Sequence, residues 1–329
     1  MAAATPALRK PSGTCIGGFS PSRPGFASPD RRGAFHRRGD RAREMPYHRG
    51  TVETSALTVR FWGVRGSIAC PSPAYMGFGG NTSCLEVWAG ERLLILDAGT
   101  GIRPLGQRLR REGARDADIL FSHTHWDHVN GFPFFAPAFE PDHAFRVFAG
   151  HLAEQGGIRE ALAGHMHEPM FPVPLDVMRA RLSFNDFRAG ETLDLGPGVG
   201  VRTAPLNHPN GATAYRIERQ GKSVCYVTDT EHVPGRPDER ILELIAGADL
   251  VVYDSTYTDA EFPGRVGWGH STWQEGLRLC RRAGARRLVV FHHDPDHDDE
   301  VMAGIERDLA AESESDGHLV AREGLQLAL

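Results

Sequence analysis

The sequence predicts an α/β protein, an αββα sandwich in which two mixed β-sheets pack face to face and helices cover their outer surfaces. Short apolar runs typical of buried strands alternate with helical patterns in both halves of the chain. Several of these runs end directly at a histidine or an aspartate. The stretch before about residue 57 shows neither pattern, so we expect the fold to begin there.

The composition is that of an ordinary globular enzyme, with 40% hydrophobic and 24% charged residues. No run of about 18 apolar residues occurs, so we expect no membrane-spanning helix and no membrane partner. The five cysteines are odd in number and form no Cys-x-x-Cys pair, which argues against a disulfide framework and a structural zinc finger. We therefore expect a protein of the reducing cytoplasm.

Residues 1–56 differ from the rest. They hold ten Lys/Arg against four Asp/Glu, a net charge of +6, so residues 57–329 carry −11 of the total of −5. This stretch is poor in aliphatic residues, and we predict a disordered basic arm before one domain at 57–329. A transit peptide, an arm that binds an anionic surface, and a true start near Met45 remain alternatives.

Each element of the first half follows from its local pattern. Apolar or alternating runs predict strands at 58–64, 84–88, 92–96, 117–121 and 145–148. A helix is predicted at 102–112, because Leu105 and Leu109 share one face, and a second at 157–164. The excursion at 151–181 is either a lid over the site or a peripheral helix on the sandwich.

The second half repeats the pattern. Strands are predicted at 199–206, 213–218, 223–228, 250–253 and 287–291. Helices are predicted at 240–245, from a cap at Ser271 or Thr272 to about 283, and at 301–311.

Four potential metal ligands follow the strand at 117–121, in the run Ser122-His123-Thr124-His125-Trp126-Asp127-His128. Alternate side chains of an extended chain point the same way, so His123 and His125 can grip one ion. Asp127 and His128 lie further along and can face a second ion about 3.5–4 Å away, as in two-metal hydrolases. Such a spacing predicts a site for two metal ions.

This run, with Gly131-Phe132-Pro133-Phe134-Phe135 after it, resembles the H-x-H-x-D-H signature of the metallo-β-lactamase fold superfamily, near its ribonuclease Z and phosphodiesterase-like branch. The resemblance spans about 57–329 and implies two divalent metals; we favour zinc, with manganese and iron as alternatives. It also implies the ligand set, with Asp127 acting on the attacking water as well. The first metal would take His123, His125 and His208; the second would take Asp127, His128 and His292; Asp229 would bridge both.

Three further choices concern residues near this set. We choose His292 over His293 as the ligand, because His292 directly follows its strand. The resemblance assigns Asp97 a structural role, tying its loop to the backbone. His165 and His167 repeat the His-x-His spacing but follow no strand, and we predict that they are not ligands.

The run Gly267-Trp268-Gly269-His270-Ser271-Thr272 resembles the Gly-His-Ser-Thr element of ribonuclease Z-like enzymes. There the histidine assists the departing oxygen, so the resemblance implies that His270 is a catalytic acid. A histidine merely bonded at a helix start is the alternative. The predicted catalytic residues are thus Asp127 and His270.

The expected function is hydrolysis of a small phosphodiester, such as a cyclic nucleotide, because the chain shows no ribonuclease Z-type arm for binding tRNA. The main alternative is hydrolysis of a thioester, lactone or β-lactam, whose enzymes usually lack the His270 element. An iron-dependent oxidoreductase is a third possibility, and His125 argues against its flavoprotein type. The acidic balance of 57–329 disfavours a nucleic-acid partner, and a homodimer stays open.

We predict that removing residues 1–50 leaves folding and turnover of small substrates nearly unchanged, because the arm has too few apolar residues to contribute to a core. Thermal denaturation and steady-state kinetics of the truncated protein test this. A large fall in melting temperature would contradict it.

Overall fold

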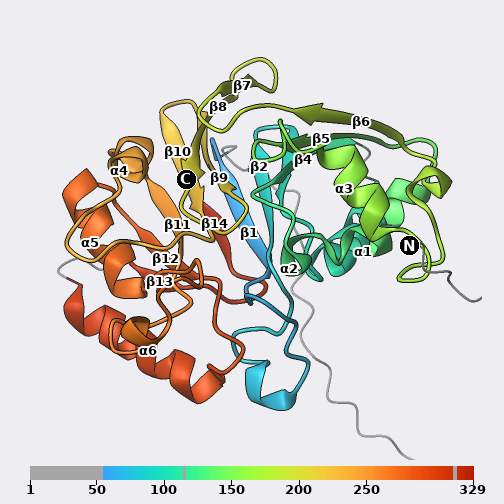
Figure 1. Ribbon diagram of the computed structural model, residues 1–329. Coiled ribbons are helices and arrows are strands. Elements are labelled where there is room, and N and C mark those ends of the chain that lie inside the picture. Colours follow the sequence, from blue (N-terminus) through green and yellow to red (C-terminus); the bar gives the residue numbers. More distant parts are fainter. Residues whose placement is uncertain (1–54, 114–115, 314–316) are drawn as a thin grey trace, which may run out of the picture. The chain divides into compact units, whose positions relative to one another are not determined.

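Two seven-stranded mixed sheets face each other in the computed structural model, which describes residues 55–113, 116–313 and 317–329 (Figure 1). The predicted αββα sandwich is therefore confirmed. The predicted basic arm lies outside the described residues, apart from Ser55 and Ala56.

The first sheet contains the strands that lead to the His-x-His run. Strands β3, β4, β5 and β6 pair parallel, whereas β14, β1, β2 and β3 pair antiparallel. In spatial order its strands are β14 (Gln326–Ala328), β1 (Thr58–Gly63), β2 (Cys84–Ala89), β3 (Arg92–Leu96), β4 (Asp116–Phe121), β5 (Ala144–Ala149) and β6 (Arg181–Asp186).

The second sheet carries the remaining strand-end histidines and aspartates. Strands β10 to β13 are parallel, and β7 to β10 pair antiparallel. In spatial order its strands are β13 (Leu319–Val320), β12 (Leu288–Phe291), β11 (Leu250–Asp254), β10 (Lys222–Val227), β9 (Ala212–Arg219), β8 (Gly200–Leu206) and β7 (Thr192–Asp194).

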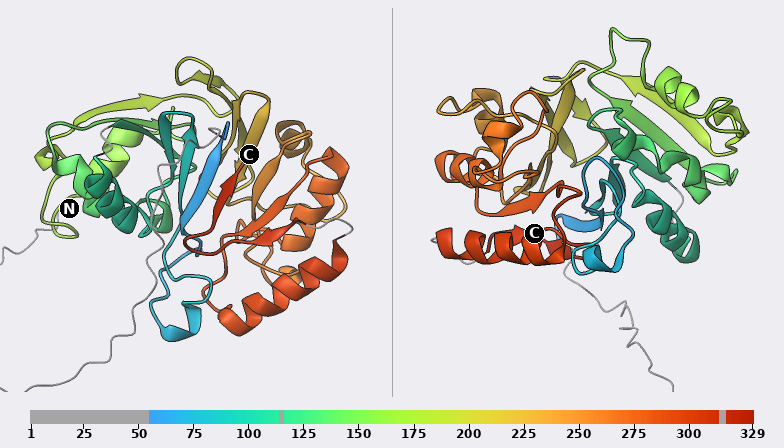
Figure 2. Two further views of the ribbon diagram at one scale, coloured as in Figure 1. Left: turned by 180° about the vertical axis from the view of Figure 1, so that it is seen from behind. Right: turned by 60° about the horizontal axis from the view of Figure 1, so that its bottom comes forward.

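Three apolar layers hold this arrangement together. The layer between the sheets includes Phe61 and Phe291, whose ring centres lie 6.1 Å apart. Helices α1 and α3 cover the outer face of the first sheet, and α4, α5 and α6 cover that of the second (Figures 1 and 2). The helices are α1 (Ile102–Glu112), α2 (Trp126–Val129), α3 (Ile158–His165), α4 (Glu239–Ile245), α5 (Trp273–Ala283) and α6 (Asp299–Glu312), with short 3-10 turns at Pro73–Tyr75, Phe132–Phe134, Ala136–Phe139, Leu175–Val177 and Phe262–Gly264.

Local chemistry fixes where the helices begin and end. The hydroxyl of Thr272 accepts a hydrogen bond from the N–H of Glu275 and so begins α5, as the capping pattern predicts. Gly113 and Gly284 end α1 and α5 with φ of 73° and 64°, a left-handed conformation that glycine adopts without a steric penalty. Leu105 and Leu109 are both buried on α1, as predicted.

Four strands, β6, β7, β13 and β14, escaped the sequence prediction. Strand β6 is only half buried, and the other three have two or three residues each. They are the four edge strands of the two sheets. An edge strand has a neighbour on one side only, so few apolar residues mark it in the sequence.

The excursion at residues 151–181 contributes a packed helix. The side chains of Ile158 and Leu162 on α3, and of Met166 after it, join the outer apolar layer of the first sheet. The lid role of this segment stays a prediction. Within the described residues, no helix is long and apolar enough to cross a bilayer.

Candidate metal centre

All seven predicted ligands lie just beyond the C-terminal ends of four strands. Strand β4 leads to the His-x-His run, and β8, β10 and β12 lead to His208, Asp229 and His292. Asp229 and His292 have φ of 57° and 63°, a conformation that costs a non-glycine residue free energy. Such backbone strain is typical of residues whose side chains must be aimed at one point.

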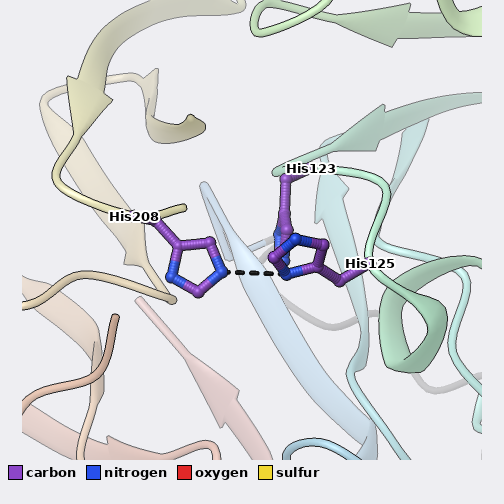
Figure 3. Close-up of side chains that lie close together, drawn as sticks. All are labelled: His123, His125 and His208. Carbon is purple, nitrogen blue, oxygen red and sulfur yellow. Dashed lines mark hydrogen bonds between the residues drawn. The ribbon is translucent and has the colours of Figure 1, made fainter. Parts of the chain in front are cut away.

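The first group of ligands is a triangle of imidazoles, His123, His125 and His208 (Figure 3). Their ring centres lie 4.5 Å, 4.7 Å and 4.8 Å apart. Nε2 of His208 lies 3.0 Å from Nδ1 of His125. The predicted fold requires His123 and His208 to lie within about 7 Å of each other, since both would bind the same zinc at about 2 Å. With their ring centres 4.7 Å apart, they meet this requirement.

The second group is Asp127, His128, Asp229 and His292, and all four are buried. Nε2 of His128 lies 3.3 Å from Nε2 of His292. Oδ2 of Asp127 lies 3.1 Å from the first of these nitrogens and 3.2 Å from the second. Three side chains thus point their ligand atoms at one small space.

Asp229 lies between the two groups. Its Oδ2 is 3.2 Å from Nε2 of His128, and its Oδ1 is 3.4 Å from Nε2 of His292. Oδ1 is also 3.7 Å from Nε2 of His123 and 3.8 Å from Nε2 of His208. One carboxylate therefore faces both groups, the position that a bridging ligand needs.

The protonation states suit divalent cations. Burial holds the pKa of His123 well below its ordinary value, and its Nε2 is buried without a hydrogen-bond partner. Burial acts to raise the pKa of Asp229, but His292, His128 and His123 outweigh it and keep the carboxyl ionised. Neutral imidazoles and ionised carboxylates are the forms that bind metal.

The imidazole of His128 carries a proton that metal ions would replace. Burial acts to lower its pKa, but Asp127, Asp229 and Asp97 raise the pKa well above the ordinary value. Without metal, a proton on this imidazole offsets the buried carboxylates. Metal binding would displace that proton, so the residues fit two divalent ions.

Asp97 holds the His-x-His loop from behind. Its carboxylate accepts hydrogen bonds from the N–H and the hydroxyl of Ser122, both at 2.7 Å, and from Nδ1–H of His128 at 2.8 Å. The hydroxyl of Tyr226 on β10 donates to the same carboxylate at 2.8 Å. These bonds agree with the structural role expected for Asp97, and they keep a proton on Nδ1 of His128, so that Nε2 is the nitrogen that can bind metal.

Two more of the predicted ligands, His208 and His292, are also oriented through a hydrogen bond at Nδ1. Nδ1–H of His208 donates to the carbonyl oxygen of Gly269 at 2.8 Å. Nδ1–H of His292 donates to the hydroxyl of Thr256 at 3.0 Å. A side chain at Gly66 would lie 2.4 Å from the His292 ring, so only glycine leaves room for that imidazole.

His270 lies beside both groups and is paired with a residue that the sequence analysis missed. Its Nδ1–H donates to Oδ2 of Asp254 at 3.0 Å, and its ring stacks on His292 with the centres 5.0 Å apart. Burial acts to lower the pKa of His270, but Asp254, with smaller effects of Asp229 and Asp127, raises it to about 9. Asp254 directly ends β11, the same signal that marked the other strand-end residues.

The histidines whose sequence suggested a ligand role but which lie outside the two groups include His293, His165 and His167. Nε2–H of His293 donates to the carbonyl oxygen of Ala321, so this ring points away from the site. His165 and His167 also stay outside every group of potential ligands among the described residues. His297, a few residues after His293, is buried, and its Nε2 pairs with Glu261 at 2.8 Å.

Known proteins resemble this chain in sequence and in fold. The family model described as "Beta-lactamase superfamily domain" matches residues 92–293. A ribonuclease Z of Brevibacillus brevis is 35% identical over 96 residues, which is 29% of this chain and 28% of that protein. A ribonuclease Z of Myxococcus xanthus is 28% identical over 264 residues, covering 66% of this chain and 83% of that protein.

Among solved structures, a metallo-beta-lactamase fold protein of Bacillus subtilis superposes with a TM-score of 0.61 at 18% identity. The superposition covers 83% of this chain and 99% of that one. At this identity the likeness supports the fold alone.

Replacing Asp229, the predicted bridging carboxylate, gives the sharpest test of the ligand set. We predict that Asp229→Ala loses bound metal and activity together, because both groups share this residue. Metal content after dialysis, measured by mass spectrometry, and hydrolysis rates check the prediction. Asp118→Ala is a matched control, since Asp118 is equally buried but pairs with Arg92 and Arg146 instead. Full metal content in Asp229→Ala would show that the bridge is wrongly assigned.

Proposed function

The chain belongs to the beta-lactamase superfamily, and from that membership we propose that it is a di-metal hydrolase of small phosphodiesters, with zinc as the favoured metal. The observation that carries the proposal is the hydrogen-bonded pair of His270 and Asp254 beside the two ligand groups. Hydrolysis of an activated ester needs no such proton donor. Hydrolysis of an alkyl phosphodiester does, because its alkoxide leaving group must be protonated.

The seven ligands would hold two ions side by side. Two divalent cations there supply the chemistry of two-metal hydrolases: they activate water at neutral pH and neutralise charge that develops on the phosphoryl oxygens. The protein contributes the buried carboxylates and oriented imidazoles described above, which fix the place of that charge before the substrate arrives.

Asp127 supplies the carboxylate that acts on the attacking water. Its Oδ2 accepts a hydrogen bond from the N–H of Ser67 at 2.8 Å, which holds the side chain in place. Burial acts to raise its pKa, but His128 and His292 lower it well below the ordinary value, so the group is ionised. An ionised carboxylate here can orient the attacking water and accept its proton.

His270 supplies the proton for the leaving group. Because Asp254 accepts from Nδ1–H, the proton on Nε2 is the one available to a departing oxygen. The raised pKa of about 9 keeps this imidazole protonated at neutral pH. After the oxygen has left with this proton, the His270 imidazole can take up a new proton from water before the next cycle.

Ribonucleic acid is the second candidate substrate, because the matched relatives named above are ribonucleases Z. The net charge of −11 on residues 57–329 disfavours a long polyanion. Assays with a cyclic nucleotide and with a precursor tRNA, run side by side, separate the two candidates.

The acid role of His270 predicts a contrast between substrates. His270→Ala should keep both metals but lose about 10²–10⁴-fold in activity on alkyl or cyclic phosphodiesters, whose alkoxide departs poorly without a proton. Nitrophenyl esters should lose little, because nitrophenolate leaves without protonation. Steady-state kinetics on both substrate types measure the contrast.

Each substrate serves as the control for the other, since a folding defect in His270→Ala would lower both hydrolysis rates. Equal losses would reject the acid role and leave His270 as a positioning residue. A wild-type protein that cleaves thioesters or lactones but no phosphodiester would replace the proposed function with the alternative ester class.

A further inference from the structure

Solvent reaches the two ligand groups past His125 and His270, which are only partly buried. The second ligand group is buried, and the side chain of His208 is only 2% exposed. A substrate must therefore approach along the imidazoles of His125 and His270. The parts of the substrate that do not react will contact the residues around these imidazoles.

Two exposed tryptophans lie next to this side in the chain, Trp126 as the first residue of α2, where its ring centre lies 6.2 Å from that of His165, and Trp268 on the loop before His270. Trp126 stands between His125 and Asp127 in the chain and is 64% exposed. Trp268 is 57% exposed and precedes Gly269, whose carbonyl oxygen accepts from His208. Since His125 and His208 are in contact, the two chain segments that carry the tryptophans meet at the first ligand group. Large exposed aromatic surfaces at a site are typical of ligand contacts.

A cationic side chain connects Trp268 to His270. The guanidinium carbon of Arg265 lies 5.0 Å from the ring centre of Trp268 and 5.8 Å from that of Tyr257. The Tyr257 ring lies 6.1 Å from the His270 ring. A row of contacts thus runs from Trp268 at the surface through Arg265 and Tyr257 to His270, with the last two rings edge to face. The charge of Arg265 complements an anionic substrate.

The loop that carries this stack is held firmly. The carboxylate of Glu231 accepts hydrogen bonds from the N–H groups of Gly267 and Gly269, at 2.7 Å and 2.8 Å, on either side of Trp268. The tryptophan is thus displayed from a fixed backbone. An exposed ring on a fixed backbone loses little conformational entropy when a flat ligand stacks on it.

We propose that Trp126 and Trp268 bind the base of a nucleoside phosphodiester, whose phosphate lies at the metal ligands; the inference rests on the proposed function. The aromatic surfaces suit the flat face that every nucleobase presents, and Arg265 suits an anion beside it. The net charge of −11 on residues 57–329 limits the substrate to a small nucleotide rather than a strand. Stacking is tolerant of base identity, so different bases should be accepted.

The test uses two esters that share a leaving group, adenosine 5′-(p-nitrophenyl phosphate) and methyl p-nitrophenyl phosphate. Trp126→Ala and Trp268→Ala should each lower kcat/KM for the adenosine ester by about tenfold, the typical effect of one lost base stack. The methyl ester, which has no base, should be hardly affected. Trp126→Phe should restore most of the loss, because it keeps an aromatic face.

Val301→Ala is the control, since Val301 is 42% exposed on α6 and should change neither rate. Calorimetric titration of the full-length protein with adenosine 5′-monophosphate measures the stacking apart from turnover, and both tryptophan variants should bind it more weakly. Equal losses on the two esters, or unchanged affinity for the nucleotide, would overturn the inference while leaving the proposed function intact.

Two other outcomes are distinct. A wild-type protein that cleaves neither ester would refute the proposed function itself. Light scattering that shows a wild-type dimer but monomeric tryptophan variants, with unchanged ester selectivity, would mean that a second copy covers these rings; that result also overturns the inference.

Discussion

Two buried carboxylates, Asp127 and Asp229, set the constraint on which the site depends. They are 6% and 1% exposed, and a buried ionised carboxylate is costly unless positive charge or hydrogen bonds offset it. Imidazoles surround both, and a proton on His128 offsets part of the charge when no metal is bound. The ligands therefore already lie in place before any cation binds. The free energy of folding of the sandwich offsets the penalty of bringing these charged groups together.

The sandwich meets that cost by linking its two sheets at the site. Asp97, at the end of β3 in the first sheet, accepts hydrogen bonds from the loop after β4 and from Tyr226 of the second sheet. One carboxylate thus fixes the distance between the sheets where their ligands converge. Asp254 has the corresponding function on the other side, because it accepts from His270 and also from the hydroxyl of Thr256, which holds His292.

The sequence predicted those parts of the molecule whose signal is local. The run of His123 to His128 lies within one loop, and the central strands are apolar enough to recognise. Asp254 ends its strand as the predicted ligands do, but its pairing with His270, 16 residues away in the chain, is made only by the fold. The burial of His297 depends on Arg65, 232 residues away in the chain, which donates to its carbonyl oxygen. Short edge strands and the positive φ of Asp229 and His292 likewise depend on tertiary contacts that no local pattern encodes.

The central claim is that two cations share Asp229 between two sets of ligands. Anomalous diffraction from crystals of the zinc-loaded protein locates the ions directly. The account predicts two peaks about 3.5–4 Å apart, one among His123, His125 and His208, the other among Asp127, His128 and His292. A single peak would contradict it, as would an ion held by the neighbouring group of Asp254, His270 and His292, because His270 would then be a ligand and could not serve as the acid.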